Sequence, residues 1–152
     1  MRRFTVLCCV AVLAACAKKD QPPAADSSAM MTPPAATMAD LAGKWNFQTK
    51  REGSDSVLLT YELNATADTS GWTITFPGRD PIPVRVVAAM AGDSVVTEAG
   101  PYESALRKGV QVWTHNVFHL ESGSLRGTSV AHYAVNTADS VVNLTSTGTK
   151  AP

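Results

Sequence analysis

The amino-acid sequence predicts an all-β domain, in which about eight strands close into an antiparallel up-and-down β-barrel. Beyond residue 39, apolar and polar side chains alternate over short stretches, which is the period of a strand with one buried face. Glycine, serine, asparagine and aspartate separate these stretches, and most connections are short enough for hairpins. Consecutive hairpins with a single apolar face lose both sheet edges when they close into a barrel. A two-sheet β-sandwich is the alternative arrangement.

The composition fits one folded domain and excludes one class of function. Charged residues make up 17% and hydrophobic residues 45% of the 152 residues, which is typical of a globular chain. The 13 basic and 13 acidic residues cancel. Because nucleic-acid-binding proteins normally carry a basic excess, a nucleic-acid partner is not expected.

Residues 1–15 have the organisation of a bacterial signal peptide. Two arginines precede an uncharged run from Phe4 to Ala15, which is too short to cross a hydrocarbon core of about 30 Å. The run leads into Leu13-Ala14-Ala15-Cys16. This motif resembles the lipobox of bacterial lipoproteins, and the resemblance implies cleavage before Cys16 and lipidation of that cysteine. An ordinary secretory signal is the alternative.

Lipidation of Cys16 implies a protein held on a membrane, because two or three acyl chains make anchoring effectively permanent. In lipoproteins, Asp directly after this cysteine favours retention at the inner membrane. Ala17 stands there instead, which implies the periplasmic face of the outer membrane. All three cysteines lie within residues 1–16. The domain that follows is therefore expected to hold no disulfide and no thiolate metal site.

Residues 16–39 are expected to form a disordered tether that starts with the lipidated cysteine and leads to a barrel domain at 40–152. Residues 17–39 include seven alanines and four prolines and show no apolar period. Met30, Met31 and Met38 have no histidine nearby, so a methionine-rich copper site is not expected.

Each strand of the domain is expected from its own alternation. In the first strand, at 44–50, Trp45 and Phe47 share one face and are expected to point inward. The same period predicts further strands whose inward positions are rich in aliphatic and aromatic residues. These strands are expected at about 56–64, 72–76, 82–90, 93–98, 110–120, 124–135 and 140–147.

The segment 100–109 permits two interpretations. Tyr102, Ser104 and Leu106 alternate, which favours a strand with a kink or bulge at Gly100-Pro101. A proline at the start and Gly109 after the end would instead suit a single helical turn. We favour the strand.

The start of the domain, Leu41-Ala42-Gly43-Lys44-Trp45, resembles the Gly-x-Trp opening of lipocalin-like domains. The resemblance implies a β-barrel in which Trp45 closes the base beneath the first strand. In that superfamily an arginine on the last strand covers this tryptophan, whereas residues 140–147 contain no arginine. The resemblance therefore bears on the fold and hardly on the function.

The three histidines are the candidates for a metal site. His115 and His119 are four residues apart on one expected strand, so they share a face without being adjacent. His132 lies on the next strand, and the turn between the two strands decides whether it joins them.

Two turns are open at this position. A two-residue turn at Ser122-Gly123 places His132 opposite Trp113, on the face of the other two histidines. A three-residue turn at 121–123 places His132 on the other face. We favour the three-residue turn, because Ser-Gly forms a poorer two-residue turn than Asn-Gly, and we therefore expect no three-histidine metal site.

No catalytic residue, metal or cofactor is expected. Glu98, Glu103 and Glu121 lie near this hairpin in the sequence, but nothing in their spacing brings them together for acid–base chemistry. The chain contains no Gly-x-Ser-x-Gly motif and no phosphate-binding loop. The three tryptophans are expected in the core rather than on a ligand platform: Trp45, Trp72 and Trp113.

The lipocalin-like resemblance implies a non-enzymatic module that binds a small apolar ligand or lipid. The alternative is an envelope protein-interaction or inhibitor module with a filled barrel, as in small barrel lipoproteins that inhibit lysozymes. A ligand carrier requires a sizeable apolar cavity, whereas an interaction module shows a collapsed lumen and an exposed patch or protruding loop. Because the inward positions are rich in large side chains, a mostly filled lumen is expected.

Overall fold

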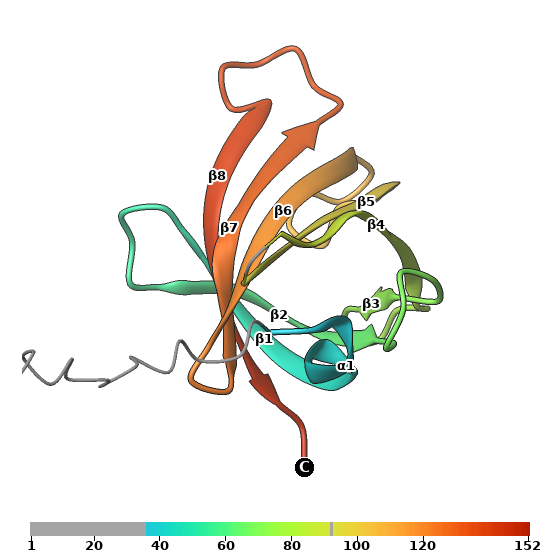
Figure 1. Ribbon diagram of the computed structural model, residues 1–152. Helices are drawn as coiled ribbons and strands as arrows, with labels where there is room; N and C mark the ends of the chain where they lie inside the picture. Colours follow the sequence, from blue (N-terminus) through green and yellow to red (C-terminus); the bar gives the residue numbers. More distant parts are fainter. Residues whose placement is uncertain (1–35, 92) are drawn as a thin grey trace, which may run out of the picture. The chain divides into compact units, whose positions relative to one another are not determined.

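The computed structural model describes residues 36–91 and 93–152, which form a closed eight-stranded barrel with a short helix at one end (Figure 1). Neighbouring strands are antiparallel and follow the order of the sequence, and the first strand also pairs with the last. The up-and-down barrel expected from the sequence is confirmed. Its elements are α1 Met38–Leu41, β1 Gly43–Arg51, β2 Val57–Ala65, β3 Thr73–Thr75, β4 Ile82–Ala91, β5 Ser94–Glu103, β6 Gln111–Glu121, β7 Ser124–Tyr133 and β8 Val141–Lys150.

Several predictions from the sequence concern residues outside this range. They are the signal peptide at 1–15, the lipidation site Cys16, most of the tether, and Met30 and Met31.

The base of the barrel is built around Trp45, as the sequence predicts. Trp45 and Phe47 are each 1% exposed on the inner face of β1. The indole Nε1 of Trp45 donates a hydrogen bond of 2.8 Å to the carbonyl oxygen of Leu41 in α1. The ammonium of Lys150, at the end of β8, lies 5.3 Å from the Trp45 ring centroid. A cation from the last strand therefore covers this tryptophan, as in lipocalin-like domains. Here it is a lysine, and it lies three residues beyond the expected end of the strand at 147.

The folded part of the chain begins before residue 40. The backbone N–H and the hydroxyl of Thr37 both donate to the Asp40 carboxylate at 2.8 Å, and these bonds hold the pKa of Asp40 below its usual value. Met38 packs against the core, and Leu41 is fully buried. Residues 37–39, expected as the end of the tether, thus belong to the domain.

Strand β5 continues through Gly100-Pro101 and carries a register shift between Ala99 and Tyr102. The predicted bulge is confirmed and the helical turn is wrong. Gly100 is required here, because its φ is +116° and a Cβ would lie 2.7 Å from the carbonyl oxygen of Val112. The strand ends at Glu103, earlier than expected, because the Ser104 hydroxyl accepts two backbone N–H groups and starts a turn.

The three-residue turn favoured for the β6–β7 hairpin is wrong. Glu121 pairs with Ser124, so the turn has two residues, Ser122 and Gly123, with φ values of +48° and +78°. Two positive φ values match the twist of the flanking strands. Pairing then continues along both strands as far as Val112 and Tyr133, and this ladder outweighs the local cost of a left-handed serine.

The wall of the barrel has the least backbone pairing at β3, which has only three residues. It pairs with β2 at three positions, from Glu62 to Asn64, and with β4 at two. The first half of β2 therefore has no hydrogen-bonded neighbour from β3. Residues 76–81, which connect β3 to β4, follow directly after the short strand.

Candidate functional site: a filled lumen and two outer surfaces

The lumen of the barrel is almost completely filled by side chains. Phe47 stacks on Tyr61 with ring centroids 4.9 Å apart, and Phe118 lies 5.1 Å from Phe47. Two glycines make room for these rings, because a Cβ at Gly148 would lie 2.6 Å from the Phe47 ring and one at Gly127 would lie 2.7 Å from the Phe118 ring. The cavity that remains has a volume of only about 50 Å³. The expected filled lumen is confirmed.

Polar side chains cross the middle of the lumen and bond to one another. The hydroxyls of Thr49 and Ser146 are 2.8 Å apart, and the Asn116 amide donates to the carbonyl and hydroxyl oxygens of Thr97 at 3.4 and 3.3 Å. Within residues 36–91 and 93–152, every buried side-chain nitrogen or oxygen has a hydrogen-bond partner. These hydrogen bonds stabilise the filled interior.

Two tyrosines in the lumen are held in the neutral form. Burial raises the pKa of Tyr102 to about 12, and burial also raises the pKa of Tyr61 far above its usual value. Hydrogen bonds to Thr114 and to Ser146, respectively, oppose these shifts only in part. Neither phenol is therefore a base near neutral pH.

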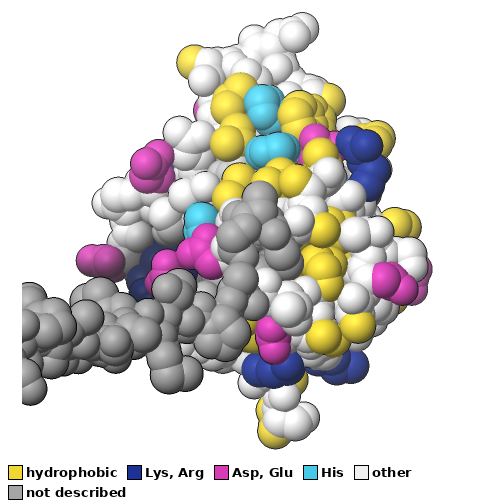
Figure 2. Space-filling model, in the orientation of Figure 1, with side chains coloured by type: hydrophobic (Ala, Val, Ile, Leu, Met, Phe, Trp, Pro, Cys, Tyr) yellow, Lys and Arg dark blue, Asp and Glu magenta, His cyan; other side chains and the backbone are white. Residues whose placement is uncertain are grey.

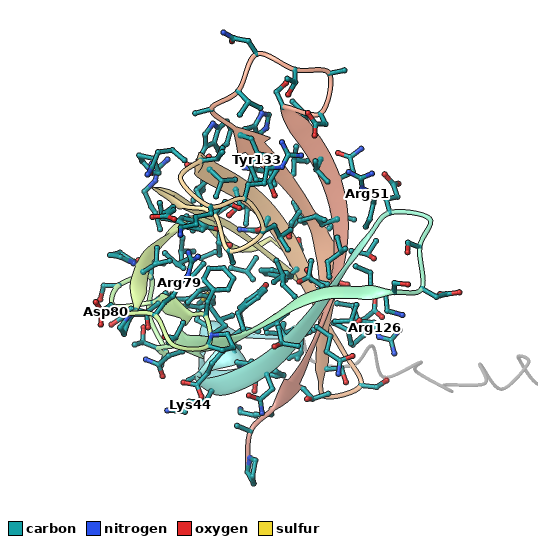
Figure 3. All side chains as sticks on the ribbon, turned by 180° about the vertical axis from the view of Figure 1, so that it is seen from behind. Lys44, Arg51, Arg79, Asp80, Arg126 and Tyr133 are labelled. Atoms are coloured by element: carbon teal, nitrogen blue, oxygen red, sulfur yellow. The ribbon has the colours of Figure 1, made fainter. Side chains whose placement is uncertain are left out.

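The β5–β6 connection is fixed across one end of the barrel by two arginines. Arg79 donates to the carbonyl oxygens of Glu103 and Ser104 at 2.6 and 3.1 Å. Arg107 lies over the ring of Tyr133, 4.0 Å from its centroid, and pairs with Asp139 at 2.7 Å. Figure 3 shows Arg79 and Tyr133 on either side of this connection.

The three histidines share the outer face of the β6–β7 hairpin, because the turn has two residues. Each nevertheless has its own partner. The Nδ1 atom of His115 is 3.4 Å from Glu98, and that of His119 is 3.3 Å from Asp93. The His132 ring stacks on Trp113, with centroids 4.1 Å apart and planes 4° apart. In the described part of the chain, no three His, Cys, Asp or Glu residues are grouped so that they could hold a metal ion.

The three carboxylates near the hairpin are also held separately. Glu98 pairs with Arg85 on the outer wall, and this hydrogen bond is the main reason that the pKa of Glu98 lies below its usual value. Glu103 accepts the backbone N–H of Gly109 at 3.0 Å, and Glu121 is 4.0 Å from Arg126. This arrangement brings no two of the three together.

The first outer surface is an aromatic platform made by Trp113, His132, Val141 and Pro101. Trp45 and Trp72 are buried as expected, but the prediction of a core position for Trp113 is wrong, because this side chain is 43% exposed. Val141 faces His132 across the strands and is 50% exposed. A hollow of about 180 Å³ lies beside the stacked rings and includes Pro101. Figure 2 shows histidines lying among hydrophobic side chains on one face of the barrel.

The sequence carried a signal for this platform. The buried residues of β6 occupy even positions, such as Val112 and Phe118. Trp113 shares the odd positions with His115 and His119, so strict alternation places it outside.

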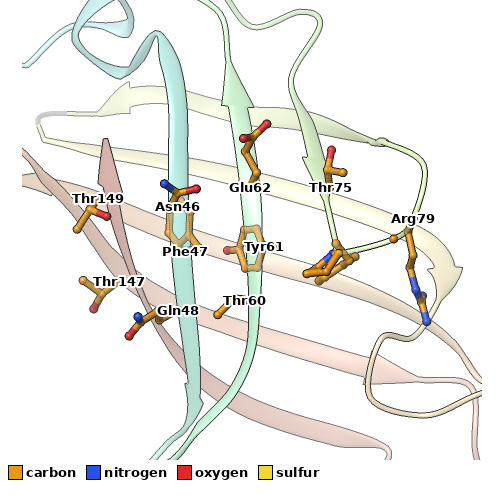
Figure 4. Close-up of a pocket in the computed structure, with 13 residues that line it drawn as sticks. Asn46, Phe47, Gln48, Thr60, Tyr61, Glu62, Thr75, Arg79, Thr147 and Thr149 are labelled. Atoms are coloured by element: carbon orange, nitrogen blue, oxygen red, sulfur yellow. The ribbon is translucent and has the colours of Figure 1, made fainter. Parts of the chain in front are cut away.

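The second outer surface is a wall groove of about 570 Å³ over β8, β1, β2 and the β3–β4 connection (Figure 4). The strand registers arrange its polar side chains in two cross-strand rows. The first row is Thr149, Asn46, Glu62 and Thr75, and the second is Thr147, Gln48 and Thr60. Arg79, Tyr61 and Phe76 also line the groove, but the Tyr61 ring lies on the inner side of the wall, where it stacks on Phe47.

No helix among the described residues is long and apolar enough to cross a membrane. No family model matches the chain, and comparisons with curated proteins and with solved structures find no match either.

Proposed function

We propose that this chain is a lipid-anchored envelope protein whose barrel is a non-enzymatic protein-binding module rather than a carrier of a small apolar ligand. The filled lumen carries this proposal. Pockets that enclose a small molecule measure roughly 300–1,000 Å³, whereas the lumen cavity measures about 50 Å³. A lipid would enter only if several buried aromatic rings left the core.

The aromatic platform is the surface that best supports protein binding. Trp113 is half-exposed although it is a large apolar side chain, and its stacking on His132 holds it in one orientation. Tryptophan is enriched among the residues that dominate protein interfaces, because a rigid ring buries a large area at a small entropic cost. An exposed apolar cluster of this kind is typical of an interaction site.

The lipid anchor rests on the lipobox-like motif that ends at Cys16, and Ala17 supports the periplasmic face of the outer membrane. A Cys16→Ser chain tests the anchor directly. Labelled palmitate is expected to enter the wild-type protein and not the variant. Incorporation at the wild-type level into the variant would refute the lipid-anchor assignment.

Protein binding is tested by photo-crosslinking in intact envelopes. A photoreactive residue replaces Val141, which pairs with His132 two strands away from the intact Trp113, and the matched control carries it at Thr128, an exposed position on the same wall. We expect a discrete crosslinked protein at 141 that disappears with Trp113→Ala and is competed by excess purified wild-type protein. The purified Trp113→Ala protein should not compete.

The opposing result is defined by a lipophilic probe. A fluorescent fatty acid should show no saturable one-to-one binding to the protein, because the lumen lacks the volume for it. One-to-one binding, together with the absence of a product that depends on Trp113, would refute the protein-binding module in favour of a ligand carrier.

A further inference from the structure

The aromatic platform holds an unused hydrogen-bond donor, which restricts what can cover it. The chain has three tryptophans, and the indole Nε1 atoms of Trp45 and Trp72 donate to backbone carbonyl oxygens at 2.8 and 2.9 Å. The Nε1 atom of Trp113 makes no hydrogen bond to any residue of 36–91 or 93–152. Because a buried indole N–H normally finds an acceptor, a partner that covers Trp113 must bring one.

The hollow beside the stacked rings carries no free charge. Its lining, which comes from β5, β6, β7 and the residue after β7, includes no lysine, arginine, aspartate or glutamate. Arg107, which lies over the neighbouring Tyr133 ring, is already paired with Asp139. An acidic, basic or phosphorylated segment would therefore lose water at this hollow without gaining an opposite charge.

The spacing of the platform selects the conformation of its partner. Trp113 pairs with His132, and His132 pairs with Val141, so the exposed apolar side chains at the two ends stand two strands apart. Two strand spacings amount to about 9.6 Å. Residues on one face of a polyproline II helix recur every three residues, or about 9.3 Å. The corresponding repeats are about 6.6 or 13 Å in a strand and about 5.4 or 11 Å in an α-helix. The polyproline II repeat comes closest to the spacing of the platform.

The backbone of a polyproline II segment also suits the unused donor. This helix has no internal hydrogen bonds, so its carbonyl oxygens remain available to the Trp113 N–H. Proline has no backbone N–H, so covering it with apolar rings leaves no donor without a partner. An extended strand would instead need an open sheet edge, whereas β6, β7 and β8 are each paired on both sides.

From these observations we propose that the aromatic platform binds a proline-rich segment of its partner in the polyproline II conformation, laid across β6, β7 and β8. This inference rests on the proposed protein-binding function and names the chemistry of the partner. One apolar residue of the segment lies against Trp113, and the residue three positions along lies against Val141. A carbonyl oxygen of the segment accepts the Trp113 N–H.

The test is an NMR titration of the full chain in detergent with a neutral peptide made of four Ala-Pro-Pro repeats. We expect a saturable shift of the Trp113 indole N–H resonance with a Kd below about 1 mM. The indole resonances of the buried Trp45 and Trp72 should stay in place. A peptide of four Ala-Ser-Ser repeats has the same length but lacks the rings that fix the conformation, so it should bind at least about tenfold more weakly.

Two variants test the two contacts. Val141→Ala should weaken binding of the Ala-Pro-Pro peptide about fivefold, because apolar contact is lost. Trp113→Phe keeps an aromatic ring but removes the N–H donor, and it should also weaken binding about fivefold. Val87→Ala is the matched control and should leave the affinity unchanged, because it makes the same change at an exposed position of β4 outside the platform.

Three results would overturn the inference: no saturable shift of the Trp113 resonance, equal affinity for the two peptides, or equal affinity of the folded Val141→Ala and Val87→Ala proteins. A crosslinked protein at position 141 that depends on Trp113, found without binding of the Ala-Pro-Pro peptide, would keep the protein-binding module and refute the proline-rich partner. Peptide binding with the expected losses but without such a crosslinked protein would support the ligand chemistry and refute the binding of an envelope protein.

Discussion

Replacing Trp45 with alanine should remove a large share of the stability of the barrel. Trp45 is 1% exposed, so its truncation forfeits burial and leaves a cavity, which typically costs about 3–5 kcal/mol for a buried tryptophan. The lost hydrogen bond to the Leu41 carbonyl adds about 1 kcal/mol. The sum of about 4–6 kcal/mol compares with the roughly 5–15 kcal/mol that stabilise a domain of this size.

Trp113→Ala is the matched control, because the same atoms are removed from an exposed position. It should cost about 1 kcal/mol, and Asn46→Ala, next to Trp45 but outside the barrel, less than about 0.5 kcal/mol. Urea unfolding of residues 36–152, followed by far-UV circular dichroism, measures all three. A difference of less than about 1 kcal/mol between the two tryptophan variants would refute the inward placement of Trp45.

Three further predictions concern the packing and the ends of the barrel. Gly127→Ala should lower the free energy of unfolding in urea by at least about 3 kcal/mol, since its Cβ would lie 1.9 Å from the Val117 carbonyl oxygen. A loss below about 1 kcal/mol would mean that β6 and β7 move apart easily at this point. Residues 36–152 should melt like the full chain, whereas residues 43–152 should lose about 3 kcal/mol with the buried Leu41; equal melting of the two fragments would show that α1 contributes nothing. Above pH 10 the unfolded state releases the protons of Tyr61 and Tyr102, whereas the folded state keeps both, that of Tyr102 up to about pH 12. The stabilisation should therefore be fully present below pH 10 and then fall by about 1.4 kcal/mol per pH unit for each of the two tyrosines. Tyr102→Phe should make this alkaline slope, measured by urea unfolding at each pH, shallower, and an unchanged slope would contradict the assigned pKa.

The strands could be predicted from the sequence because the alternation of apolar and polar residues is a local pattern. Trp45 and Phe47 both face inward because alternate residues of any strand lie on the same face, and glycine, serine, asparagine and aspartate mark where each strand ends. The prediction for the β6–β7 turn was wrong because Ser122 adopts a left-handed backbone conformation, which serine disfavours when local preferences alone are considered. The preference of one residue is small, and the pairing of two long strands overrides it.

The wall groove could not be predicted from the sequence, because its rows are assembled by closure of the barrel. Asn46 stands opposite Thr149 of β8, more than a hundred residues later in the chain, and opposite Glu62 of β2. The alternation of β8 shows only that its threonines share an outer face. Which of them lies beside Asn46 depends on the stagger of the whole barrel.

The shortness of β3 has a consequence for how the barrel opens. Amide protons exchange with solvent fastest where few backbone hydrogen bonds must break, so the β2–β3–β4 region should exchange first and the β6–β7–β8 region last. Phe76 directly follows β3, is 5% exposed and lines the lumen, so detachment of β3 would expose this ring. Proteases and hydrophobic dyes would then reach the interior through this side of the barrel, so the strand with the least backbone pairing would decide how readily the protein is cleaved.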